Sequence, residues 1–103
     1  MSTRPKQCLQ NPWERAWVQE NGGDSADYPR NRNALGRLGV EETKIIKDFY
    51  RELGITVYEV KDVPMGHTRA HCSYPASYKL FLRVADLDAQ RMEGHGYQRE
   101  VPP

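Results

Sequence analysis

The sequence has few cysteines, no excess of either charge and no long apolar run, and each absence excludes a class of protein. Two cysteines in 103 residues are too few for the disulfide framework of a small secreted domain. Fifteen basic residues against fourteen acidic ones create no net field that would attract nucleic acid or an anionic membrane surface. No apolar stretch approaches the ~20 residues needed to cross a bilayer.

Motifs that indicate a cofactor or a common reaction are also missing. The sequence has no phosphate-binding loop, dinucleotide fingerprint, zinc knuckle or hydrolase motif, so no cofactor is expected. The basic first residues are not followed by an apolar run, which argues against a secretory signal and for a soluble, cytoplasmic protein. Cys8 and Cys72 are then expected as free thiols, although a Cys8–Cys72 bridge stays open if the N-terminal arm folds over the later loop.

The first helix is indicated by the residues that typically start a helix. Asn11 is a good N-cap, Pro12 suits the first helical position, and Glu14 can reach back to the Asn11 N–H as in a capping box. Trp13 and Trp17 then share one face at helical spacing. The alternative is a strand that ends in the Gly-Gly turn at residues 22–23, and the specific cap chemistry favours the helix.

The main amphipathic helix is expected over residues 40–53, because apolar residues recur on one face and Gly54 is placed for a left-handed C-cap. Strands are expected over residues 55–62 and 78–84, which are rich in β-branched and aromatic residues. A short helix should follow over residues 87–93. Two strands need a further partner to be stable, so either an N-terminal segment supplies a third strand or two chains pair their edges.

These elements predict one α+β domain. Its small antiparallel sheet has two or three strands, extended across a dimer in one alternative, and packs against the main helix with a shorter N-terminal helix beside it. Residues 1–10 are expected to form a mobile arm, residues 24–39 an irregular segment, and residues 95–103 a flexible tail. A homodimer is expected because the predicted strands leave an edge to be paired.

Chemistry concentrates on residues 64–75, the connector between the two strands. Connections of about a dozen residues are uncommon unless they are functional or disordered. Four of its side chains can make polar contacts to a ligand: His67, Arg69, His71 and Tyr74. Trp13 and Trp17 would add an apolar wall. We therefore expect a small module that binds a small molecule or another protein.

An enzyme is the alternative from a different class. Cys72 would be the nucleophile and His67 its base, because a nearby imidazole favours the thiolate. His67, His71 and Cys72 are also zinc ligand types. However, adjacent His71 and Cys72 rarely bind one ion together, and a fourth ligand would have to come from distant Cys8 or His95. No metal site is therefore predicted.

Nucleic-acid binding is the third hypothesis. Four arginines and two tyrosines in the predicted loops could contact phosphates and stack on bases: Arg30, Arg32, Arg37, Arg69, Tyr28 and Tyr74. The near-neutral net charge argues against it, because nucleic-acid binding proteins usually carry a basic surface.

Overall fold

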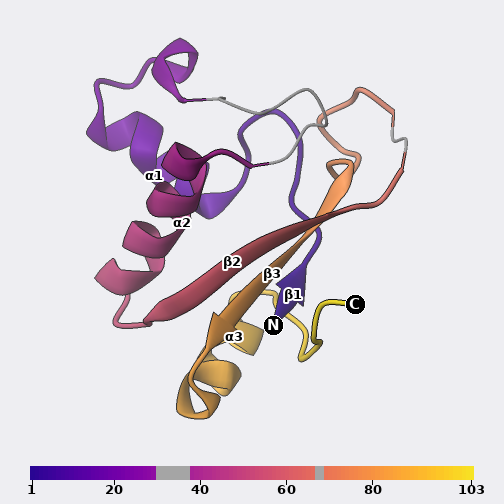
Figure 1. The fold of residues 1–103 in the computed structure, drawn as a ribbon. Coiled ribbons are helices and arrows are strands. Elements are labelled where there is room, and N and C mark those ends of the chain that lie inside the picture. Colours follow the sequence, from indigo (N-terminus) through magenta and orange to yellow (C-terminus); the bar gives the residue numbers. More distant parts are fainter. Residues whose placement is uncertain (30–37, 67–68) are drawn as a thin grey trace.

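The computed structural model describes residues 1–29, 38–66 and 69–103, and these form an α+β fold (Figure 1). In chain order, its elements are β1 (Ser2–Thr3), α1 (Pro12–Glu20), the 3-10 turn η1 (Ser25–Asp27), α2 (Val40–Glu52), β2 (Val57–Pro64), β3 (Tyr78–Val84), the 3-10 turn η2 (Asp86–Asp88) and α3 (Ala89–Gly94). The predicted fold class is confirmed. No helix in the described ranges is both long and apolar enough to span a bilayer.

Helix α1 begins where the sequence predicts. Asn11 is the N-cap, and the Glu14 carboxylate accepts a hydrogen bond from the Asn11 backbone N–H at 3.1 Å, the contact expected of a capping box. The Asn11 side chain turns to the preceding segment, where it accepts from the Lys6 N–H at 2.8 Å and donates to the Lys6 carbonyl at 2.9 Å. The predicted helix is therefore confirmed, and the alternative strand is not formed. Asn11 links the start of this helix to Lys6 in the preceding segment.

Helix α2 is the main amphipathic helix and buries Ile46 and Tyr50. Gly54 ends it with a φ of +81°, a left-handed conformation that glycine adopts without a Cβ clash. The Arg91 guanidinium on α3 donates to the carbonyls of Leu53 and Gly54. This cation satisfies otherwise unpaired carbonyls at the negative end of the α2 dipole.

The sheet has three antiparallel strands in the order β1-β3-β2. Ser2 and Thr3 pair with Phe81 and Leu80, so an N-terminal segment supplies the third strand, as one of the two alternatives predicted. Gln98 from the C-terminal segment forms a further bridge to Ser2 on the other side of β1. The third strand therefore comes from the same chain and needs no second copy.

Strand β2 contains a one-residue bulge that explains its mixed apolar pattern. Val57 and Glu59 pair with successive residues of β3, so Tyr58 is an extra residue in the ladder. Because of this insertion, Val57 and Val60 both pack against the core although three positions separate them. Strict alternation along the strand would place these two valines on opposite faces, and the bulge brings them to the same face.

The core lies between one face of the sheet and the three helices. Met92 from α3 and Tyr97 beyond it join α2 there, and the Tyr50 and Tyr97 hydroxyls are hydrogen-bonded at 2.8 Å. Burial raises the pKa of Tyr50 to about 12. The fully or nearly buried members of the cluster are Trp13, Ile46, Tyr50, Ile55, Val57, Ala76, Tyr78, Leu80, Leu82, Met92 and Tyr97.

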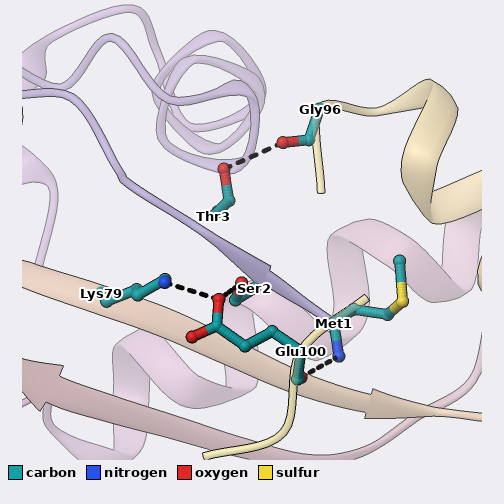
Figure 2. A network of polar contacts seen from close by, with 6 residues as sticks. All are labelled: Met1, Ser2, Thr3, Lys79, Gly96 and Glu100. Atoms are coloured by element: carbon teal, nitrogen blue, oxygen red, sulfur yellow. Dashed lines mark hydrogen bonds and ion pairs between the residues drawn. The ribbon is translucent and has the colours of Figure 1, made fainter. Parts of the chain in front are cut away.

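The two chain ends meet over β1 and β3 (Figure 2). The Met1 ammonium donates to the Glu100 carbonyl at 3.1 Å, and the Ser2 hydroxyl donates to the Glu100 carboxylate at 2.8 Å. Lys79 pairs with the same carboxylate at 2.5 Å. Hydrogen bonds from Lys79 and then Ser2 lower the pKa of Glu100. The segments predicted as a mobile arm and a flexible tail thus have specific partners in each other.

Candidate functional site

The predicted binding residues lie on two separate surfaces. Arg69, His71 and Tyr74 lie on the connector after β2, at the upper right of Figure 1. Trp13 and Trp17 lie on α1, beside α2 at the left of the same view. The remaining predicted site residue and three of the four arginines of the nucleic-acid hypothesis fall outside the described residues: His67, Arg30, Arg32 and Arg37.

A disulfide joins Cys8 to Cys72, with their Cα atoms 5.3 Å apart. The expectation of free thiols is therefore wrong for this form of the protein, and the bridge that the sequence left open is present. We call residues 4–8 and 69–76, which this bond joins, the disulfide clamp. A nucleophilic thiol at Cys72 exists only after the bond is reduced, so the cysteine-enzyme hypothesis stays a prediction about the reduced form.

Hydrogen bonds reinforce the disulfide clamp on both sides of the covalent bond. The Ala76 N–H donates to the Pro5 carbonyl at 2.8 Å. The Gln7 side-chain amide donates to the carbonyls of Arg69 at 2.6 Å and Pro75 at 3.1 Å. The N-terminal segment thus holds residues 69–76, the end of the connector that leads into β3.

Within the clamp, Arg69 and His71 gather around the ring of Tyr74. The Arg69 guanidinium lies 5.8 Å from the ring centre, and the His71 ring meets it edge-on at 5.8 Å. The Ser73 backbone N–H donates to Nδ1 of His71 at 3.1 Å. That bond makes Nδ1 the acceptor, so the proton of the neutral ring lies on Nε2. Three of the four predicted polar residues are therefore neighbours.

A groove of about 590 Å³ lies between α1 and α2. Its apolar wall consists mainly of Trp13, Trp17, Ile45, Phe49 and Leu53. Trp17 packs edge-on against buried Tyr28, with ring centroids 5.6 Å apart, which fixes one side of the groove. Volumes of roughly 300–1,000 Å³ with apolar and aromatic walls are typical of small-molecule sites.

The described residues on the rim of the groove carry a surplus of negative charge. Lys44 and Arg51 both pair with Asp48, at 2.5 Å and 2.8 Å. The hydrogen bond from Lys44 lowers the pKa of Asp48. Three more carboxylates line the groove without an ion pair to any described residue: Glu20, Glu41 and Glu52. The rim therefore attracts a cation.

Trp13 and Tyr28 are both almost fully buried. Trp13 is only 2% exposed, so it belongs mainly to the core, and its indole N–H has no acceptor in the part of the chain that the structure describes. Such a group costs about 1–3 kcal/mol. Tyr28 is 3% exposed and donates to Glu42 at 3.1 Å. Because it is buried, Tyr28 offers no stacking face to a base.

Sequence reasoning missed the second wall of the groove and half of the clamp. Phe49 has the helical spacing of a core residue, and in the structure it is half-buried, packs against the core and also lines the groove. Arg4 and Lys6 lay in a segment expected to be a loose arm, but they lie beside Tyr74 around one hollow. The signal that could have found them is the absence of acidic residues from both segments of the clamp.

Among the described residues, no group of three or more potential ligands is arranged to hold a metal ion. Comparison of the chain with protein-family models, curated proteins and solved structures finds no significant match. A functional interpretation therefore depends on the two surfaces themselves.

Proposed function

We propose that the protein is a small binding module that holds an organic cation with an apolar body in the groove between α1 and α2. The observation that supports this proposal is the combination of an aromatic wall with uncompensated carboxylates on its rim. The apolar body would lie between Trp17 and Phe49, where half-buried rings offer area that binding would remove from water.

The charge of the ligand follows from the rim. Among the described residues that line the groove, four are carboxylates and two are cations, and both cations pair with Asp48. A positive group on the ligand would thus meet Glu41 and Glu52 on α2 or Glu20 on α1. Aromatic faces add to this preference, because the π face of tryptophan attracts cations.

A titration with three probes of similar size tests the proposal. Benzyltrimethylammonium is the cation, neopentylbenzene is its uncharged counterpart and phenylmethanesulfonate is the anion. Binding is followed through the indole N–H signals of the two tryptophans in nuclear magnetic resonance spectra. We expect the cation to shift the Trp17 signal at the lowest concentration, the neutral probe to bind more weakly and the anion to leave the signal unchanged.

Two variants separate groove binding from general attraction of a cation. Glu41→Gln with Glu52→Gln should weaken the cation and leave the neutral probe unaffected. Glu59→Gln removes an exposed carboxylate from β2, outside the groove, and should change neither. The proposal is overturned if the anion binds as well as the cation, or if Glu59→Gln weakens the cation as strongly as the rim variants do.

The homodimer and the cytoplasmic location stay predictions. β2 is the outermost strand of the described sheet on one side, and an open strand edge can pair with another chain. Sedimentation analysis of the oxidised protein would show a dimer mass if two β2 edges pair and a monomer mass if they do not. Thiol labelling in intact cells would report whether Cys8 and Cys72 are joined where the protein resides.

A further inference from the structure

The two segments of the disulfide clamp belong to parts of the chain that contain no acidic residue. Residues 1–13 and residues 63–85 have neither Asp nor Glu, although the whole chain is almost balanced. The Cys8–Cys72 bond brings these two segments together. Lys79 of the second range pairs with Glu100, but the cations of the clamp itself, Arg4, Lys6 and Arg69, form no ion pair with any described acidic residue. The potential around the clamp is therefore positive even though the net charge is close to zero.

A hollow of about 310 Å³ in the clamp collects hydrogen-bond donors. Arg4, Lys6 and Gln10 come from the N-terminal segment, and Ser73 and Tyr74 come from the connector, beside the disulfide sulfur of Cys72. Every one of the five side chains has an N–H or O–H donor. Arg4 and Lys6 form no ion pair with any described acidic residue.

Hydrogen bonds hold the two cationic residues of the hollow, Arg4 and Lys6, in place. Both backbone polar groups of Lys6 are hydrogen-bonded to the Asn11 side chain, at 2.8 Å and 2.9 Å. One guanidinium N–H of Arg4 donates to the Ala76 carbonyl at 3.0 Å, and the other N–H donors of the guanidinium stay available to a ligand. A site whose donors are already held in place loses less conformational entropy when it binds.

We propose that this hollow is a binding site for a small molecule that carries a phosphate group, with Arg4 and Lys6 as its two cationic contacts. The Tyr74 hydroxyl would donate to a further phosphate oxygen, whereas the Ser73 hydroxyl lies 2.6 Å from Nδ1 of His71 and donates there. The site is distinct from the groove between α1 and α2, because the two share no lining residue, and it takes a ligand of the opposite charge.

The disulfide makes this site dependent on redox state. Cys72 lines the hollow, and its bond to Cys8 links the segment of Arg4 and Lys6 to the segment of Ser73 and Tyr74. Reduction would leave only hydrogen bonds between the two halves. We therefore expect the reduced protein, and the Cys8→Ser/Cys72→Ser variant, to bind phosphate about tenfold more weakly through lost preorganisation.

Calorimetric titration of the oxidised protein at low salt, with inorganic pyrophosphate and with AMP as probes, tests the proposal. Lys6→Gln is the main variant because its side chain makes no contact that supports the fold in the described structure. We expect it to weaken binding about tenfold or more, as the loss of one charged hydrogen bond implies. Arg4→Gln should do the same, and its fold is checked by circular dichroism.

Arg83→Gln is the matched control, since it removes one exposed positive charge from the far end of β3. It should leave binding of both probes within about twofold, the size of a screened long-range effect. Equal weakening by Arg83→Gln and Lys6→Gln would overturn the proposal, because binding would then reflect overall charge. The proposal would also be overturned if neither pyrophosphate nor AMP bound, or if only an oligonucleotide bound. Groove binding of the organic cation is measured separately, so failure of one site does not decide the other.

Discussion

Removal of the disulfide should be the most damaging simple change to the stability of this protein. In the Cys8→Ser/Cys72→Ser variant the folded state keeps the hydrogen bonds of the clamp, and the unfolded chain gains freedom. The two cysteines are 64 positions apart, and closure of a loop of that length costs the unfolded state about 4 kcal/mol of chain entropy. Domains of this size are stable by roughly 5–15 kcal/mol, so much of the margin depends on one bond.

Urea unfolding, followed by tryptophan fluorescence, measures this effect. With a slope of about 1–2 kcal/mol per molar urea for a small domain, the loss of about 4 kcal/mol should lower the midpoint by about 2–4 M. The slope itself should rise, because an unlinked chain exposes more surface when it unfolds. Wild-type protein kept reduced should behave like the serine variant.

Two results would refute this reasoning. If the variant unfolds within about 1 kcal/mol of the oxidised protein, chain entropy is not the main effect of the bond, since the expected cost is about four times larger. If the unfolded, unreduced protein reacts with two equivalents of a thiol reagent, Cys8 and Cys72 are not joined. A lone serine at either position leaves the other thiol free and serves as the control for loss of the sulfur itself.

Three further predictions concern helix ends and buried phenols. Asn11→Ala should cost about 1–2 kcal/mol, because it removes both side-chain hydrogen bonds to Lys6 in the preceding segment, and chemical unfolding measures the loss. Gly54→Ala should cost about 1–2 kcal/mol because alanine resists a φ of +81°, whereas Gly94→Ala, where φ is ordinary and the added Cβ meets nothing within 4 Å, should not destabilise. Burial raises the pKa of three phenols, those of Tyr28, Tyr50 and Tyr97. The folded state therefore holds these protons more tightly than the unfolded state does. Stability is complete below about pH 10 and falls as pH rises through the folded-state pKa. The absorbance of these three tyrosinates should appear only together with unfolding. Because the chain has six tyrosines, ionisation of four or more phenols in folded protein would contradict this.

The parts of the fold that sequence predicted are those with strong local patterns. β3 was predicted with its observed bounds because apolar residues occupy every second position from Tyr78 to Val84, while Phe81 shares the other face with two cations. Helix α1 was predicted from Asn11, Pro12 and Glu14, because the Asn11 N–H and the Glu14 carboxylate meet within one turn. Local chemistry decides both elements, so no knowledge of the rest of the chain was needed.

The parts that sequence could not predict depend on contacts between distant residues. A strand of two residues, Ser2–Thr3, has no periodicity, and it exists only because β3 offers it an edge. The distance between Cys8 and Cys72 is set by the whole fold, so the sequence left their pairing open. Phe49 has the helical spacing of a core residue and still lines a groove, since spacing shows which face is apolar but not what covers it.

The bulge in β2 has a consequence for how the gene could tolerate deletions. Loss of Tyr58 alone would join Val57 directly to Glu59 and give a regular ladder, with every later side chain on its present face. Loss of Val63 would instead leave Pro64 one step out of register with Tyr78 and turn it to the opposite face. Within β2, deletion of the Tyr58 codon therefore keeps the strand register, whereas deletion of the Val63 codon shifts it.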